Sequence, residues 1–237
     1  MPKPYCYEYP HPAVATDLCV FSLDKEMRLV ALFIRRKQPP FEDQWALPGG
    51  FIKVGAENLD QCARRELMEE TGTEAAHLEQ FGAYSDPGRD PREHVISVGY
   101  LALIRHSPAV AGTDAAEAKW FPIETTKKGD LLVNGRRAQL AFDHRKILTD
   151  ALQRLRRRID EAPIVFVVMP EQFTLAQLQS AFETIKGEEL DKRNFRKWVI
   201  DKDWLKETGE FQRGRQRPAV LFTVGKKISK LYAQGQK

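Results

Sequence analysis

Apolar residues in the first part of the chain are gathered in short runs separated by polar segments, a pattern typical of β-strands. The runs at 13–23 and 29–36 are rich in β-branched residues, and the polar residues between them indicate a turn, so we predict two strands of one sheet. Proline and glycine punctuate 39–51, which we interpret as a loop. The segment 84–104 begins as a polar loop and ends as a strand, and 118–124 is a short strand with a proline break.

Two other segments have the spacing of amphipathic helices. The first is predicted over about 59–71, because Asn58 and Gln61 form a suitable N-cap pair and Gly72 is a suitable stop. The second is predicted over 141–160, where one face gathers the apolar residues Ile147, Leu148, Ala151, Leu155 and Ile159. The exposed side of this second helix is predicted to carry Arg154, Arg156, Arg157 and Arg158.

Strands interleaved with one central helix and followed by a second helix indicate an α/β sandwich. We place the domain boundary along or just after the second helix. The first domain then covers residues 1–148, and the second covers 149–237 and begins with a linker helix.

From residue 173 the pattern changes to two short helices joined by a tight turn. Thr174 and Gln177 form a capping box at the start of the first helix, and Gly187 is a natural stop. Its apolar face is formed by Leu175, Leu178, Phe182 and Ile185. The second helix is expected to follow Asp191 as N-cap, with a buried face made of Phe195, Trp198 and Val199.

The outer face of that second helix is basic, which is the pattern of a helix-turn-helix. Candidate DNA contacts on it are Lys192, Arg193, Asn194, Arg196 and Lys197. Two strand-like runs, ending near Phe211 and starting near Ala219, flank a hairpin tip with Arg213, Arg215 and Arg217. A helix-turn-helix followed by a basic hairpin predicts a winged helix that binds DNA. A protein-binding winged helix and a generic basic surface are the alternatives.

Composition and charge support two domains with different partners. The 237 residues are 42% hydrophobic and 30% charged, which fits a globular protein, and no apolar run approaches the ~20 residues of a membrane span. Residues 151–237 hold 18 Lys+Arg and 11 Asp+Glu, a net charge of +7, which leaves −3 for residues 1–150. A polyanion is the natural partner of the basic part, with a solvated surface as the alternative.

The N-terminus lacks the apolar core of a signal peptide, so we expect a cytoplasmic protein that does not contact a membrane. The three cysteines, Cys6, Cys19 and Cys62, are odd in number and have no metal-like spacing. We therefore expect free thiols rather than a disulfide framework or a zinc site.

Three glutamates fall within five residues of the helix predicted at 59–71. At about 100° per residue, Glu66 and Glu70 stack one turn apart and Glu69 lies beside them. The same arc contains Leu59, so the carboxylates share the apolar stripe, where uncompensated like charges are unfavourable. A hard divalent cation, Mg²⁺ or Mn²⁺, would compensate the buried charge and remove the repulsion between the carboxylates. The alternative is a solvated charged helix, because Glu is a good helix former.

The residues around these glutamates resemble the Nudix box. Gly50, Glu57 and the run RELMEETG at 65–72 match its pattern of a glycine, a spaced glutamate and Arg-Glu-aliphatic-x-Glu-Glu-x-Gly. The resemblance implies an α/β/α Nudix sandwich that cleaves a nucleoside diphosphate linked to another group. It also implies catalytic and metal-binding roles for Glu66, Glu69 and Glu70, with Arg65 orienting the carboxylates by ion pairing.

The box departs from the family pattern at two places. Six residues separate Gly50 from Glu57, one more than usual, and Thr73 stands where an aliphatic residue is expected. The inserted residue lies in the loop before the helix, so we expect an intact helix whose preceding loop is displaced.

Further residues are candidates for nucleotide contacts. The segment 85–92 resembles the loop that Nudix enzymes of the ADP-ribose group place beside the substrate. Arg36 and Arg89 suit phosphate or ribose, with surface ion pairs as the alternative. Gly50 and Phe51 complete this set, and Phe51 would line a base pocket unless it is a core aromatic.

Two histidines and two tryptophans have other predicted roles. His94 and His144 are candidate general bases, although a structural or solvent-exposed role is favoured for each. Trp45 and Trp120 we interpret as core residues.

A Nudix domain, an arginine-bearing linker helix and a winged helix together resemble the NrtR family of Nudix-related transcriptional regulators. The segments 140–144 (LAFDH) and 213–219 (RGRQRPA) resemble that family as well. The resemblance implies a homodimer that binds operator DNA, takes ADP-ribose or a related nucleotide as effector, and represses genes of NAD metabolism. The alternative is a working ADP-ribose pyrophosphatase with an accessory winged helix. Both functions are compatible in one chain, because the acidic box positions are intact.

Overall fold

The computed structural model describes residues 7–108, 115–161, 163–212, 218–226 and 228, and its first part is built on a mixed β-sheet. The strands run in the order β5-β6-β1-β2-β7-β8-β9, while β3 pairs with β2 and β4 pairs with β1. β1 pairs with β6 in parallel, and the other strand pairs described in this sheet are antiparallel. The strands are β1 (Ala13–Leu23), β2 (Leu29–Arg36), β3 (Trp45–Ala46), β4 (Gly49–Phe51), β5 (His77–Tyr84), β6 (Val95–Leu103), β7 (Ala115–Thr125), β8 (Leu131–Val133) and β9 (Arg136–Arg137).

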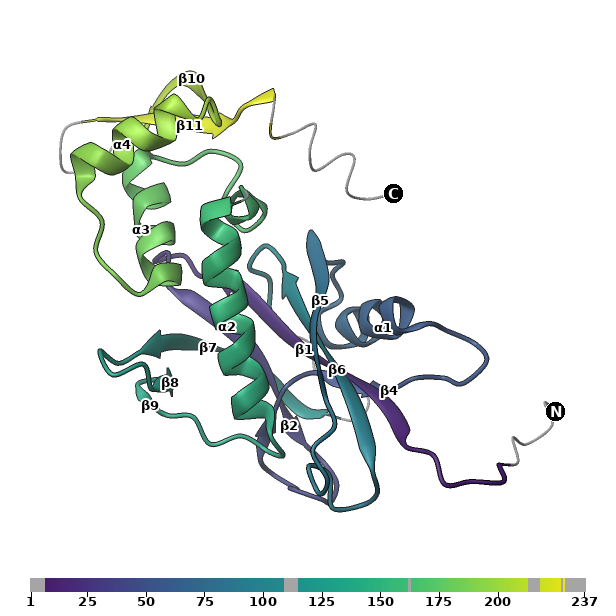
Figure 1. The fold of residues 1–237 in the computed structure, drawn as a ribbon. Coiled ribbons are helices and arrows are strands. Elements are labelled where there is room, and N and C mark those ends of the chain that lie inside the picture. The colour runs from purple at the N-terminus through teal and green to yellow at the C-terminus, as the bar shows by residue number, and fades with distance from the viewer. Residues whose placement is uncertain (1–6, 109–114, 162, 213–217, 227, 229–237) are drawn as a thin grey trace.

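Helices α1 (Leu59–Thr71) and α2 (His144–Glu161) cover opposite faces of this sheet (Figure 1). Successive side chains of a strand point to opposite faces, and β1 shows the consequence. Leu18 and Val20 belong to the core cluster under α1, whereas Cys19 and Phe21 belong to the cluster that contains the apolar face of α2. The α/β/α sandwich expected from the sequence is therefore confirmed.

The second part of the chain forms a small winged-helix unit. It comprises a 3-10 turn η1 (Ile164–Val167), helices α3 (Leu175–Lys186) and α4 (Lys192–Asp201), and a hairpin of β10 (Leu205–Gln212) and β11 (Ala219–Val224). Thr174 and Gln177 form the predicted capping box, and Asp191 accepts a hydrogen bond from the Asn194 N–H at the start of α4. A backbone bridge between Phe173 and Phe222 ties the hairpin to the segment before α3.

The two units share one apolar core. The cluster that contains the buried face of α2 continues through η1, α3 and α4 to Phe222 on β11. α2 thus packs on the sheet and on α3 at once, so it is part of the core of both units and not only a linker between them. The boundary placed at 148 and 149 stays a prediction.

Several elements differ from the prediction. α2 begins at His144 rather than 141, because Phe142 has a left-handed φ of 53°. The predicted loop at 39–51 contains the short strands β3 and β4, and β5 had not been expected. The prediction that four arginines lie on the exposed side of α2 holds for Arg157 alone. Arg156 is half-buried against α3, and Arg154 and Arg158 are half-buried against Glu79 of β5.

Other predicted features concern the core and the surface. Trp45 and Trp120 are half-buried and pack at the margin of the core clusters. Cys19 and Cys62 are buried free thiols, and Cys6 lies outside the described residues. In the part of the chain that the structure describes, no helix has the length and apolar character needed to cross a membrane.

Candidate functional site

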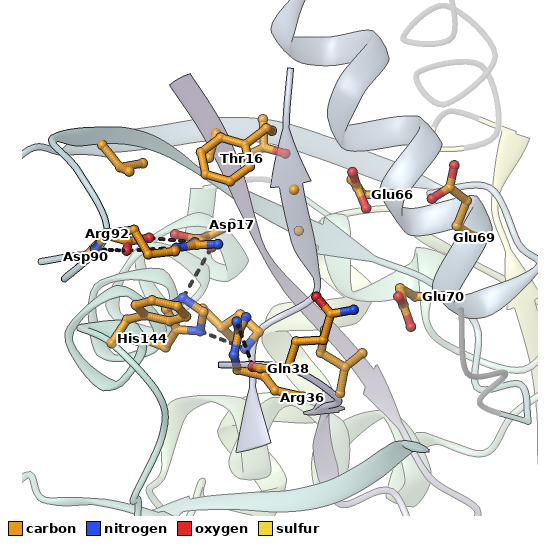
Figure 2. A pocket seen from close by; sticks show the side chains of 18 of the residues that line it. Thr16, Asp17, Arg36, Gln38, Glu66, Glu69, Glu70, Asp90, Arg92 and His144 are labelled. Atoms are coloured by element: carbon orange, nitrogen blue, oxygen red, sulfur yellow. Dashed lines mark hydrogen bonds and ion pairs between the residues drawn. The ribbon is translucent and has the colours of Figure 1, made fainter. Parts of the chain in front are cut away.

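A cavity of about 560 Å³ opens between the sheet, the acidic face of α1 and the start of α2 (Figure 2). It receives side chains from β1, β2, β4 and α1, and from the loops before β3 and β6. Eight of the residues that the sequence singled out in the first domain line it: Arg36, Gly50, Phe51, Arg65, Glu66, Glu69, Glu70 and Arg89. The structure therefore brings the predicted set together, although their roles stay predictions.

The acidic wall of the cavity is the inner side of α1. Glu66 and Glu70 are buried, with 9% and 5% of their surface exposed, and Glu69 lies at the exposed margin. Gly50 makes room for this wall, because a Cβ at that position would overlap the Glu66 carboxylate. Burial raises the pKa of Glu66, and Arg65 only partly offsets this effect.

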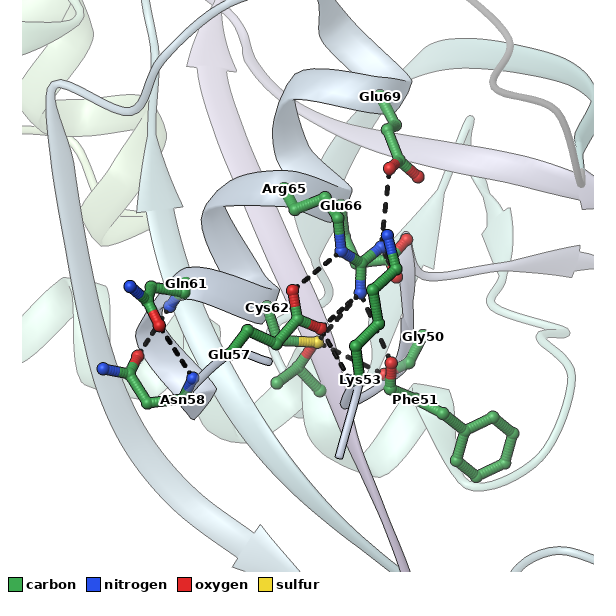
Figure 3. A network of polar contacts seen from close by, with 11 residues as sticks. Gly50, Phe51, Lys53, Glu57, Asn58, Gln61, Cys62, Arg65, Glu66 and Glu69 are labelled. Atoms are coloured by element: carbon green, nitrogen blue, oxygen red, sulfur yellow. Dashed lines mark hydrogen bonds and ion pairs between the residues drawn. The ribbon is translucent and has the colours of Figure 1, made fainter. Parts of the chain in front are cut away.

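Arg65 organises the wall through three carboxylates (Figure 3). Its guanidinium donates to both oxygens of Glu57, at 2.9 and 2.7 Å, and to Oε1 of Glu66 at 2.6 Å. It also lies 3.5 Å from Glu69. The hydrogen bonds from Arg65 lower the pKa of Glu57 to about 2. The Lys53 N–H also donates to Glu57, so the loop with the inserted residue still delivers this glutamate to Arg65.

The carboxylates of this wall are the kind of ligand that a divalent cation prefers, but they are too far apart to bind one ion together. Carboxylate oxygens are the donors that Mg²⁺ and Mn²⁺ prefer, and Glu66, Glu69 and Glu70 all face the cavity. Among the described residues, however, no three His, Cys, Asp or Glu side chains are gathered closely enough to hold one ion. Glu66 would have to exchange part of its bond with Arg65 for a metal bond.

The opposite wall is cationic and aromatic. The Arg36 guanidinium lies 4.8 Å from the centre of the Phe142 ring, and its Nε donates to the Pro40 carbonyl at 2.8 Å. Arg92 lies 5.4 Å from the ring of Phe51. Phe51 is 40% exposed and lines the cavity, so the alternative of a core aromatic is wrong. Phe142 and Arg92 were not predicted as site residues, although both lie in segments that resemble the family, 140–144 and 85–92.

The floor of the cavity is a buried charge network. Arg89, which the sequence predicted to contact phosphate or ribose, lies in this network instead. Its side chain is only 5% exposed and donates to Asp143 at 2.7 and 3.0 Å and to Asp17 at 3.0 Å. The guanidinium is thus committed to internal ion pairs, which makes the predicted phosphate contact the weaker interpretation. Asp17 and Asp143 were not predicted as site residues. The signal for Asp17 was a lone carboxylate inside an apolar strand.

His144 completes this floor. Its Nδ1 accepts a hydrogen bond from the Leu47 N–H at 2.9 Å, and its Nε2 lies 3.3 Å from Asp17. Because Nδ1 is an acceptor, the ring carries its proton on Nε2, directed at the carboxylate. A structural role for His144 is therefore favoured over a general base. His94 is exposed and does not line the cavity.

The winged-helix unit presents a second candidate site, for nucleic acid. The five selected residues of α4 are all exposed: Lys192, Arg193, Asn194, Arg196 and Lys197. The inner face of α4 is held by Phe195 and Val199, which are buried, and by Trp198, which packs edge-on against Phe182. The selected wing residues Arg213, Arg215 and Arg217 lie outside the described residues.

Comparison with known families divides the chain as its structure does. A model of the NUDIX domain matches residues 11–149, and a model of the NrtR DNA-binding winged helix domain matches residues 165–224. A relative from Acinetobacter baylyi, described as an ADPR responsive transcriptional repressor, is 35% identical over 91% of this chain and 83% of its own length.

Two solved structures of Shewanella oneidensis NrtR extend the comparison. The protein complexed with a 27mer DNA is 27% identical, with a TM-score of 0.74 over 92% of this chain and 95% of that one. Its NUDIX domain complexed with ADP ribose is 28% identical, with a TM-score of 0.54 over 62% of this chain and 90% of that one.

Proposed function

The chain belongs to the NrtR family, and from this premise we propose that it is a DNA-binding transcriptional repressor with ADP-ribose as its effector. The observation that carries the proposal is the union, in one chain, of a nucleotide-sized cavity and an exposed basic helix on a winged-helix unit. The Acinetobacter relative is described as ADPR responsive, and the Shewanella protein was crystallised with DNA and, as its NUDIX domain, with ADP ribose.

The cavity has the size and polarity that a nucleoside diphosphate needs. Its volume of about 560 Å³ falls within the range of ~300–1,000 Å³ typical of ligand sites. Phe51 and Phe142 offer rings for a base, and Arg36 offers a guanidinium that matches phosphate geometry. The acidic wall would meet the diphosphate through a bound cation.

The winged helix would bind operator DNA as part of a homodimer. In this arrangement α4 lies in the major groove, where its exposed side chains contact base edges and phosphates. The wing arginines, Arg213, Arg215 and Arg217, would contact the phosphate backbone or the minor groove. We propose that the regulated genes belong to NAD metabolism. A change in spacing between the two winged helices would alter operator affinity, provided that the ligand binds one spacing more tightly.

Hydrolysis of ADP-ribose is a second candidate function, favoured by the intact acidic wall. Glu66, Glu69 and Glu70 would hold Mg²⁺ or Mn²⁺, which when bound neutralises a diphosphate and lowers the pKa of a bound water. Arg65 keeps Glu57 and Glu66 in place, and a box carboxylate would accept the proton from the attacking water.

Two measurements test these functions separately. Fluorescence anisotropy with duplex DNA from upstream of the neighbouring genes should show binding that changes when ADP-ribose is added. Absence of binding at moderate salt, or binding that ignores ADP-ribose, would contradict the repressor. Release of AMP from ADP-ribose with Mg²⁺ should be abolished by Glu70→Gln, while DNA binding remains. No AMP release by the wild type would exclude hydrolysis and leave the repressor intact.

A further inference from the structure

Helix α2 is the element that both units share, and its two halves are held in different ways. Its first turn lies at the floor of the nucleotide cavity, and its second half packs against α3 of the winged-helix unit (Figure 1). A ligand in the cavity can therefore act on the winged helix of its own chain through this helix, if the bonds at both ends transmit the displacement.

The N-terminal end of α2 is fixed to the cavity by charged groups. Asp143, directly before the helix, accepts two hydrogen bonds from Arg89, and Arg89 also binds Asp17 on β1. His144, the first residue of the helix, joins Asp17 to the backbone of Leu47. Asp17 and His144 are buried and Asp143 is half-buried, and each has a partner in this network, so these bonds tie the start of the helix to the cavity wall.

The second half of α2 is attached to the winged helix through Arg156. Its Nε donates to the Ile185 carbonyl at 2.8 Å, and its Nη2 donates to the Thr125 hydroxyl at 2.9 Å. Ile185 lies in the last turn of α3, where carbonyls lack partners within the helix. Thr125 is the last residue of β7. One guanidinium therefore joins α2, α3 and the sheet.

Gly187 shows how closely these three elements approach. It caps α3 with a left-handed φ of 74°, and a Cβ there would lie 2.8 Å from Nη2 of Arg156 and 3.2 Å from the Thr125 hydroxyl. The turn after α3 is thus shaped around the guanidinium.

The two attachments differ in strength. Arg89 binds carboxylates, whereas the two acceptors of Arg156 are a carbonyl and a hydroxyl without formal charge. Both guanidinium groups make charge-assisted hydrogen bonds, but only those of Arg89 also gain the attraction of an opposite charge. Burial lowers the pKa of Arg156, and Glu188 only partly counteracts it. Breaking the hydrogen bonds of Arg156 therefore costs less free energy than breaking those of Arg89.

We propose that Arg156 is a positioning residue for the effector response, setting the place of α3 relative to the nucleotide cavity through α2. The proposal rests on the proposed function, because it concerns how ADP-ribose changes DNA affinity. It adds that the signal passes within one chain, from Asp143 and His144 along α2 to Ile185.

The test compares DNA affinity with and without saturating ADP-ribose in Arg156→Met. The ratio of the two dissociation constants measures the coupling, and a charge lost near DNA cancels in that ratio. We expect the ratio to fall toward one by at least ~fivefold, within the usual range of allosteric coupling, while ADP-ribose affinity of the free protein stays within ~twofold. Arg156→Lys, which retains the positive charge but has one donor nitrogen in place of the forked guanidinium, should restore part of the coupling.

Arg157→Met is the matched control, because Arg157 is the exposed neighbour on the same helix and the charge change is identical. It should keep the wild-type ratio. Thr125→Val removes one acceptor without changing charge or bulk, and it decides the question if Arg156→Met does not fold. A wild-type ratio in both Arg156→Met and Thr125→Val would overturn the proposal. A ratio of one in the wild type would instead overturn the proposed function.

Discussion

Replacing Asp17 with asparagine tests whether the buried charge network holds the cavity floor. Asp17 is 8% exposed and accepts a hydrogen bond from Ser97 at 2.6 Å, besides its contacts with Arg89 at 3.0 Å and His144 at 3.3 Å. Burial alone would raise the pKa of Asp17. The contact with His144, the hydrogen bond of Ser97 and the charge of Arg89 outweigh burial and lower it from 3.8 to about 2.

This lowered pKa converts into a pH-dependent contribution to stability. At ~1.4 kcal/mol per pKa unit, the carboxylate contributes on the order of 2 kcal/mol to the free energy of unfolding at neutral pH. Because the folded pKa lies below the unfolded one, the contribution is complete above the unfolded pKa and disappears as pH falls through the folded one. About half should be lost at pH 3. Arg89 keeps Asp143 as a partner in the variant, so we expect a cost of ~2–3 kcal/mol rather than that of a fully orphaned buried charge.

Urea unfolding of wild type and Asp17→Asn at pH 7 and pH 3, followed by tryptophan fluorescence, measures both effects. The gap between the two proteins should narrow by ~1 kcal/mol at the lower pH. Asp86→Asn is the control, since Asp86 pairs with Lys146 on the exposed surface and its loss should leave the free energy of unfolding close to the wild-type value. A cost below ~1 kcal/mol for Asp17→Asn at pH 7, or a gap that ignores pH, would refute the reasoning.

Three further variants probe the cavity and the winged helix. Gly50→Ala should displace the Glu66 carboxylate and abolish AMP release, if the wild type releases AMP, without lowering the melting temperature by more than a few degrees. Arg36→Met should weaken ADP-ribose binding by ~10-fold in calorimetry, as expected for loss of a charged hydrogen bond, and leave DNA affinity in the absence of ligand unchanged. Trp198→Ala removes the edge-on contact with Phe182 and should cost ~3 kcal/mol in urea unfolding.

Local chemistry explains what the sequence could predict. The bounds of α1 follow from Asn58, Gln61 and Gly72, whose capping bonds lie within a few residues of one another. The capping box of α3 is recognisable for the same reason. Strand β5 was not predicted, because its alternation is weak and it is specified by pairing with β6.

The unpredicted part of the site depends on long-range contacts. Arg89 meets Asp143 and Asp17 across 54 and 72 residues of sequence, so no window of the chain reveals the network. Arg156 was assigned to the exposed side because it lies off the apolar stripe of α2, but α3 covers that side of the helix. When a helix contacts two neighbours, the burial of its residues cannot be predicted from one apolar stripe.

Three consecutive residues connect the cavity to the start of α2. Phe142 stacks with Arg36 on the cavity wall, Asp143 binds Arg89 on the floor, and His144 begins the helix. The left-handed φ of Phe142 turns the chain sharply at this point, so its ring can face the cavity while the next residue points into the floor. A ligand that moves Arg36 from Phe142 would therefore act two residues before α2, next to the ion pairs that hold the start of the helix.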